Sequence, residues 1–268
     1  MKPDLLFLSL LLPLAVLAAA CTTETKDQGQ GNPAAAGNVE SSVRSAADAW
    51  NNKDLDRFLV GWTDNGLKQE FGVTHEEAGE ALSPRMGELN IDVRKMSNTN
   101  VNGNTATTDA EFIFGSTVQP ERLSLVKEGD AWKIDGTEPL RAEVPGGVTA
   151  VDVKMSEFTF GFDRSSITDG NVAFRVENIG MQPHELVLIK MDEDFDLQKA
   201  MQSPGEPEGL DFVGAIGPLE TGEQSNLVFA RKLQPGRYAM VCFMPDINDQ
   251  QQHTPHLLKG MIVEFAVE

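Results

Sequence analysis

The sequence predicts two domains, an α+β domain followed by an all-β Greek-key sandwich. Near the start of the chain, apolar residues recur at helical spacing, and stretches of alternating strand pattern follow them. The character of the chain then changes after the turn Pro145-Gly146-Gly147, beyond which short strand candidates recur between turn signals. These observations predict a first domain over residues 38–140 and a second over residues 148–268.

The first 20 residues predict a targeting signal rather than a part of the folded protein. An apolar run from Leu5 to Ala20 follows Lys2, and Pro13 interrupts it. A bilayer span needs about 20 apolar residues, so this run predicts a cleaved signal peptide over residues 1–20. Residues 21–37 are small and polar, which predicts a flexible tether.

The run ends in Leu17-Ala18-Ala19-Ala20-Cys21, which resembles a bacterial lipobox. The resemblance implies a lipoprotein signal peptide, cleaved before Cys21, and acylation of Cys21. Ala18 departs from the pattern, because Leu sits one place earlier, and an ordinary signal peptidase site is the alternative. The expected location is outside the cytoplasm, lipid-anchored to the cell envelope at its periplasmic or extracellular face.

Helices open the first domain. Its apolar residues form two helix-spaced groups, Val43, Ala46, Ala47 and Trp50, then Leu55, Phe58, Leu59 and Trp62. A third helix is predicted over Thr74–Leu82, with Thr74 as N-cap and Glu77 three residues later. Asn102-Gly103 predicts a hairpin turn. The predicted strands are Ile91–Met96, Thr105–Phe114, Arg122–Lys127 and Ala131–Asp135.

Two stretches of this domain, Ala49–Phe58 and Leu123–Asp135, resemble the nuclear-transport-factor-2-like (NTF2-like) superfamily. The resemblance implies a curved sheet around a cone-shaped pocket, whose catalytic members carry acidic residues inside the cone. Asp109 and Glu111 are the candidates for that position. This fold hosts enzymes and binding modules alike. We find no catalytic constellation here, so no enzyme activity is predicted, and a small ligand in the cone stays open.

The pattern of the second domain predicts strands and one short helix over 196–202. The predicted strands are Val148–Met155, Val172–Asn178, His184–Met191, Asn226–Leu233, Arg237–Phe243 and Gly260–Val267. Scarce residues lie at their ends. Cys242 ends one strand, His184 begins another, and His256 and Met261 flank the start of the last strand. Strand ends and loops converge at one pole of a sandwich, so these four side chains can meet there.

One thiolate, two imidazoles and a thioether are the ligand set of a blue-copper site. A single cysteine in this region argues for one copper ion, since a binuclear centre needs a cysteine pair. Zinc accepts the same ligands, but a long thioether bond gives zinc little, so copper is favoured. The alternative without metal is a packed core, in which a buried free Cys or Met is common.

Three segments, 178–188, 235–242 and 256–261, resemble the cupredoxins, the plastocyanin-like blue copper proteins. The resemblance implies that His184, Cys242 and His256 are equatorial ligands of one type 1-like copper ion. It makes Met261 the axial ligand.

The sequence departs from the cupredoxin pattern in two places. Between Cys242 and His256 lie 13 residues, a loop long enough to leave the site more open or less rigid. Glu185 follows the first histidine, where the family usually has Asn, and can alter the surroundings of the metal or offer a carboxylate ligand. His253, in the loop, is either solvent-exposed or an auxiliary copper contact.

Composition limits the function. The net charge of −19 disfavours nucleic acid as a partner. Four histidines are too few for a multicopper oxidase. The sequence therefore predicts an exported, membrane-anchored copper protein that transfers single electrons to an unidentified redox partner. The alternatives are a lipoprotein for copper capture, storage or delivery with a copper-exchange partner, and a metal-free cupredoxin-fold protein with a small-ligand pocket in the first domain.

Overall fold

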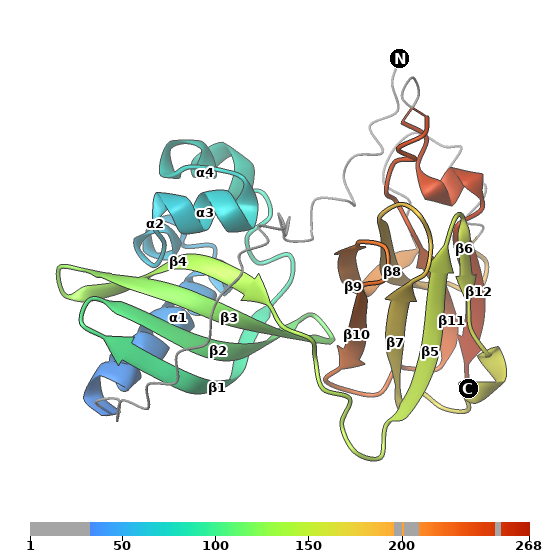
Figure 1. Cartoon of the computed structure of the whole chain (residues 1–268), viewed down its shortest axis with the longest axis horizontal. Helices are drawn as coiled ribbons and strands as arrows, with labels where there is room; N and C mark the ends of the chain where they lie inside the picture. Colours follow the sequence, from blue (N-terminus) through green and yellow to red (C-terminus); the bar gives the residue numbers. More distant parts are fainter. Residues whose placement is uncertain (1–32, 196–199, 201–208, 250–252) are drawn as a thin grey trace. The chain divides into compact units, whose positions relative to one another are not determined.

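The computed structural model describes residues 33–195, 200, 209–249 and 253–268 (Figure 1). These residues form two compact units, 33–140 and 141–268. The predicted signal peptide and Cys21 lie outside the described residues. Within the described residues, no helix is long and apolar enough to cross a membrane.

Four helices begin the first unit: α1 (Pro33–Asn51), α2 (Leu55–Val60), α3 (Asp64–Phe71) and α4 (His75–Leu82). Helix α1 begins inside the predicted tether, because Pro33 suits a first helical position and three alanines follow it. The predicted cap of α4 is present, with Thr74 N–H donating to Glu77 Oε2 at 2.9 Å. Helix α3 was not predicted, since its eight residues carry only two large apolar side chains.

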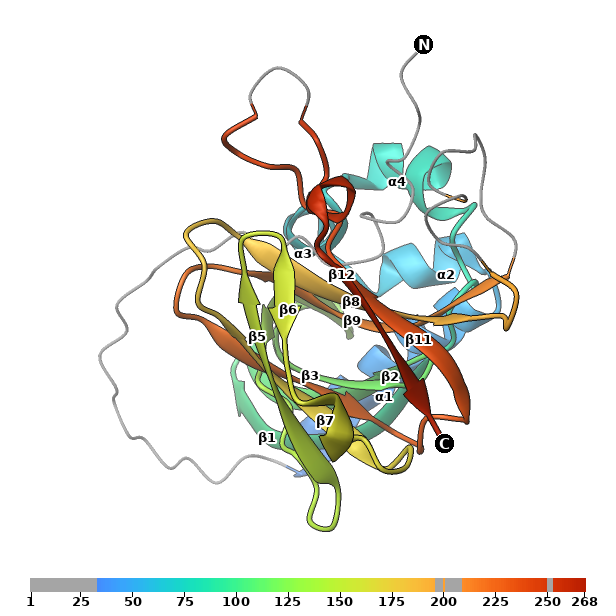
Figure 2. The same cartoon turned by 90° about the vertical axis from the view of Figure 1, so that its right-hand side faces the viewer.

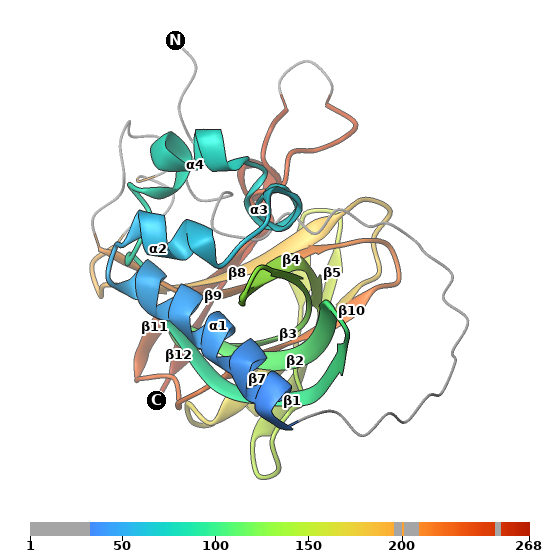
Figure 3. The ribbon, with the colours of Figure 1, turned by 90° about the vertical axis from the view of Figure 1, so that its left-hand side faces the viewer.

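An antiparallel sheet completes the first unit. Its strands are β1 (Ile91–Asn102), β2 (Thr105–Phe114), β3 (Thr117–Glu128) and β4 (Ala131–Pro139), in that spatial order. The sheet is strongly curved, and α1 runs across it (Figure 3). Between helices and sheet lies an apolar core that contains all three tryptophans of the chain, Trp50, Trp62 and Trp132.

The candidates for the interior of the cone, Asp109 and Glu111, lie elsewhere. They alternate along β2 with the buried Ala110 and therefore face away from the core. Asp109 pairs with Arg122 at 2.8 Å, and Glu111 pairs with Arg94 at 3.1 Å. The buried acidic residue of this sheet is Glu121 on β3, which is directly opposite Ala110 in the register of β2 and β3.

Two sheets pack face to face in the second unit (Figure 2). One has the spatial order β10-β7-β5-β6 and the other β12-β11-β8-β9. The strands are β5 (Thr149–Ser156), β6 (Thr159–Gly161), β7 (Val172–Asn178), β8 (His184–Met191), β9 (Leu210–Leu219), β10 (Gln224–Phe229), β11 (Gly236–Val241) and β12 (Ile262–Val267). Their inner faces bury Phe174, Leu186, Tyr238 and Met240.

The sandwich differs from the expected antiparallel pattern in one pair. Strands β5 and β7 are parallel, because β6 and the 3-10 turn η2 (Arg164–Ser166) return the chain to the end where β5 begins. Strands β6 and β9 were not predicted. The former has three residues, and glycines interrupt the apolar pattern of the latter. The helix predicted over 196–202 lies outside the described residues, apart from residue 200.

Candidate metal centre

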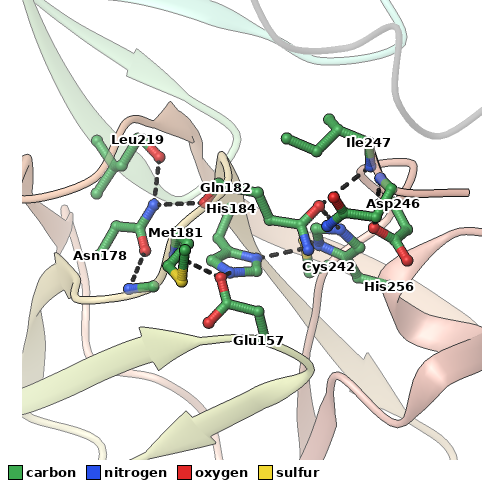
Figure 4. A network of polar contacts seen from close by, with 12 residues as sticks. Glu157, Asn178, Met181, Gln182, His184, Leu219, Cys242, Asp246, Ile247 and His256 are labelled. Atoms are coloured by element: carbon green, nitrogen blue, oxygen red, sulfur yellow. Dashed lines mark hydrogen bonds and ion pairs between the residues drawn. The ribbon is translucent and has the colours of Figure 1, made fainter.

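Three fully buried side chains meet at one end of the sandwich (Figure 4). His184 Nδ1 lies 3.0 Å from His256 Nδ1, and Cys242 Sγ lies 3.4 Å from that same His256 atom. Ligand atoms of the three residues all lie within 4.8 Å of one another. The structure therefore brings together the three donors that the sequence predicted as equatorial ligands.

Strand pairing places two of the donors. His184 is the first residue of β8, and Cys242 directly follows β11, which pairs with β8 in antiparallel fashion. Because Val187 is opposite Val241 in that register, the first residues of β8 and the last residues of β11 lie at the same end of the sheet. Cys242 and His184 consequently emerge side by side from one sheet.

Backbone hydrogen bonds place the third donor. His256 begins the 3-10 turn η3 (His256–Lys259), and its N–H donates to Met244 O at 2.8 Å. Leu257 N–H donates to Cys242 O, also at 2.8 Å. The return of the loop is thus fastened directly to the residues that follow β11.

Met261 lies beside two of these residues and is fully buried. Its N–H donates to His256 O at 3.0 Å, and its carbonyl accepts from Cys242 N–H at 3.2 Å. The backbone of Met261 therefore adjoins both Cys242 and His256, where the sequence placed the fourth ligand.

The two arms of the long loop close into a neck beside the site. Pro245 and Pro255 form an isolated bridge, and Asp246 N–H donates to Thr254 O at 3.0 Å. The buried carboxylate of Asp246 accepts from Lys259 Nζ, which fastens the neck to η3.

The two auxiliary candidates lie outside the cluster that the described residues form. His253 is exposed on the loop. Glu185 is buried, and its carboxylate accepts from Phe243 N–H at 2.9 Å while its own N–H lies 3.5 Å from Cys242 Sγ. Glu185 thus contacts the sulfur through its backbone rather than offering its carboxylate to the cluster.

Side chains from neighbouring turns surround the imidazoles, and the sequence did not identify them. Gln182 Oε1 accepts from Ile247 N–H at 3.1 Å and lies 3.2 Å from His256 Nε2. Asn178, fully buried, holds the turn that carries Gln182: its Nδ2 donates to Gln182 O at 2.9 Å and to Leu219 O at 2.7 Å. The only sequence signal for either was their place in the turn before His184.

Burial shifts the pKa values of the three side chains and so determines which of them are charged. It raises the pKa of Cys242 to about 12, against the N–H groups of Glu185 and Met244, which lower it. Burial lowers the pKa of His184, and burial together with His184 lowers the pKa of His256 to about 4. Near pH 7 the thiol is therefore protonated and both imidazoles are neutral.

This donor set fits a metal ion. Two neutral imidazole nitrogens face each other beside a sulfur, all three side chains are fully buried, and no carboxylate of the described residues belongs to the cluster. Imidazole and thiolate are ligands that both copper and zinc accept. A divalent cation that displaces the thiol proton would satisfy all three donors at once.

No protein-family model and no curated protein matches the sequence. Among solved structures, a dithionite-reduced auracyanin from Roseiflexus castenholzii is 18% identical with a TM-score of 0.30, over 46% of this chain and 99% of that chain. An NTF2-like protein of unknown function from Shewanella oneidensis is 17% identical with a TM-score of 0.30, over 40% of this chain and 98% of that chain. Another from Shewanella baltica is 6% identical with a TM-score of 0.31, over 42% of this chain and all of that chain. Likenesses of this strength do not place the chain in a family.

Proposed function

We propose that the second unit is a cupredoxin-like domain that binds one copper ion and carries single electrons. The equatorial ligands are His184, Cys242 and His256, and Met261 is the axial ligand. The observation that carries the proposal is the convergence of two Nδ1 atoms and one Sγ atom from three fully buried side chains, with the two Nδ1 atoms 3.0 Å apart.

Copper bound by this donor set would supply a one-electron Cu(II)/Cu(I) couple. The chain supplies a rigid frame, because its strands, the neck and Asn178 hold the donors from three separate segments. Burial excludes water from the donors and keeps their surroundings constant between the two charge states. The partners are a one-electron donor and a one-electron acceptor, and no covalent bond of the chain changes during a cycle.

Exposed apolar side chains favour protein partners. Four of the five large hydrophobic residues that are exposed in the described part of the chain lie on segments that carry the site. They are Ile179 and Met181 before His184, Ile247 in the loop, and Leu258 after His256. Apolar residues gathered on loops around a functional centre are suited to transient docking. The lipobox resemblance at Cys21 supports a lipid-anchored position at the cell envelope.

Copper capture and delivery is the competing function, and the neck weighs against it. Asp246, a carboxylate that the loop could offer to copper, is buried and bound to Lys259. Slow copper loss to a chelator and a reversible couple are expected of the electron carrier, whereas fast exchange without a couple would indicate delivery.

The test is a Cu(II) titration of the purified protein, followed by its visible spectrum and copper content. We expect an intense thiolate-to-copper band at one copper per chain, and its loss in Cys242→Ser. Cys21→Ser is the matched control, because it removes the other cysteine and is expected to keep the band. Colourless copper, or a band that survives Cys242→Ser, would contradict the proposal.

A further inference from the structure

The two imidazoles of the centre face different groups through their outer nitrogens. His256 Nε2 lies 3.2 Å from the neutral amide oxygen of Gln182. His184 Nε2 is a buried atom without a hydrogen bond, and the Oε1 atom of Glu157 lies 3.8 Å from it (Figure 4). One ligand therefore faces an amide and the other a carboxylate.

We propose that Glu157 is a positioning residue of this centre, which accepts the Nε2–H of His184 and shifts the bound copper toward Cu(II). The inference rests on the proposed copper function. A histidine that binds a metal through Nδ1 carries its proton on Nε2, and this buried N–H then needs an acceptor. The distance of 3.8 Å exceeds that of a hydrogen bond, but the Glu157 side chain is 37% exposed and has room to approach.

The surrounding turns are built to admit this approach. Glu157 follows β5, and its Oε1 accepts from Met181 N–H in the turn before His184. Gly180 lies between the two groups: a Cβ atom there would be 2.8 Å from Glu157 Oε1 and 2.9 Å from His184 Nε2. Only a glycine leaves the space that the carboxylate and the imidazole share.

A carboxylate at this position changes the electronic character of the ligand. Acceptance of the Nε2–H by an anion raises the basicity of the imidazole, which is how outer partners of metal-bound histidines act. The negative charge also stabilises the more positive of the two copper states. Gln182, being neutral, exerts less of this effect on His256.

The test is the reduction potential of the copper protein in Glu157→Gln, which keeps the shape of the side chain and removes its charge. We expect the band to remain and the potential to rise by about 59 mV, which is a tenfold shift of a one-electron equilibrium. Glu264→Gln is the matched control, since Glu264 is also a partly exposed, ion-paired glutamate, and it should leave the potential unchanged. Gln182→Glu should lower the potential.

A second readout needs no copper. In nitrogen-15 NMR of the protein loaded with diamagnetic Zn²⁺, which would occupy Nδ1 of His184 and leave the proton on Nε2, we expect this Nε2–H to exchange with solvent about tenfold faster in Glu157→Gln than in Glu264→Gln. Equal potentials and equal exchange rates in these two variants would overturn the role of Glu157, as would loss of the band in Glu157→Gln. Absence of a band in the unaltered protein would refute the copper function, and the exchange measurement would still decide whether Glu157 binds His184.

Discussion

His184 and His256 meet through their Nδ1 atoms at 3.0 Å, although 72 positions separate them in the sequence. Two neutral imidazoles can share only one proton at such a contact, so one of the facing lone pairs serves as the acceptor. Their outer nitrogens point to different turns, one to Glu157 and one to Gln182. The centre is thus formed by residues at strand ends and in turns, and the pairing of the strands holds these residues in place.

Gly180→Ala should weaken copper binding. The added Cβ would lie within 2.9 Å of His184 Nε2, so the imidazole or the Glu157 carboxylate must move. We expect copper affinity to fall by about tenfold to a hundredfold, the usual effect of disturbing the outer partner of a metal ligand. Competition with a chromophoric chelator measures the affinity. Gly217→Ala is the control, because a Cβ there meets nothing within 4 Å; equal affinities would contradict the crowding argument.

Gln182→Leu should loosen the neck of the loop. The substitution removes the acceptor of Ile247 N–H and the group facing His256 Nε2. Unpaired buried donors cost about 1–3 kcal/mol each, so local opening becomes easier. Hydrogen exchange at the Ile247 amide should be faster, and copper release to a chelator should be faster too. Gln234→Leu, which removes only an exposed contact with Lys232 O at 3.5 Å, should change neither rate.

Asn178→Ala should destabilise the second unit. The fully buried side chain donates to two carbonyl groups and accepts from Gly180 N–H at 2.8 Å, and all three partners would lose their contact. We expect a loss of about 3 kcal/mol, since each unsatisfied buried group is costly. Thermal unfolding measures the change. Asn171→Ala removes one exposed hydrogen bond to Gly147 O and should cost less; equal losses would show that the turn does not depend on Asn178.

Glu121→Gln should flatten the pH dependence of the first unit. Burial, followed by the charge of Glu70, raises the pKa of Glu121 well above its ordinary value of 4.5. The folded state therefore holds a proton that the unfolded state releases. This contribution to stability is complete below pH 4.5 and is lost as the pH rises toward the folded pKa. The neutral amide cannot lose that proton, so the variant should keep its stability across this range.

Urea unfolding at several pH values, followed by tryptophan fluorescence, measures this difference. The probe is specific, because all three tryptophans lie in the first unit. Glu138→Gln, at an exposed position of β4, is the control and should follow the unaltered protein. A Glu121→Gln protein that loses stability with pH as steeply as the control would contradict the buried proton.

Local patterns predicted much of the fold. The bounds of β7 and β8 are those that the sequence predicted, because alternation and turn residues mark both ends of each strand. The convergence of His184, Cys242 and His256 was also predictable, since scarce residues at strand ends have few other places to meet. The parallel pair of β5 and β7 was not, because it depends on the path of the short β6 and η2, which carry little periodic signal.

The sequence did not identify the residues whose role depends on tertiary contacts. Glu157 and Gln182 reach the imidazoles from separate turns, and neither carries a motif of its own. In the first unit, Asp109 alternates along β2 with the buried Thr108 and Ala110, whereas Glu121 shares the face of β3 that carries the buried Leu123 and Leu125. The choice of the buried one is set by which face of the sheet meets the helices, and that face is known only once the strands are paired.

The neck between Asp246 and Thr254 has a practical consequence. Because the bridge of Pro245 with Pro255 and the bond of Met244 with His256 lie on the inner side, the spacing of the donors is set before the chain reaches the loop tip. A purification tag or a partner-binding peptide inserted on the far side of this neck, after Asp249, would therefore leave Cys242 and His256 at their present separation. The loop is thus a suitable place for attaching the protein to an electrode.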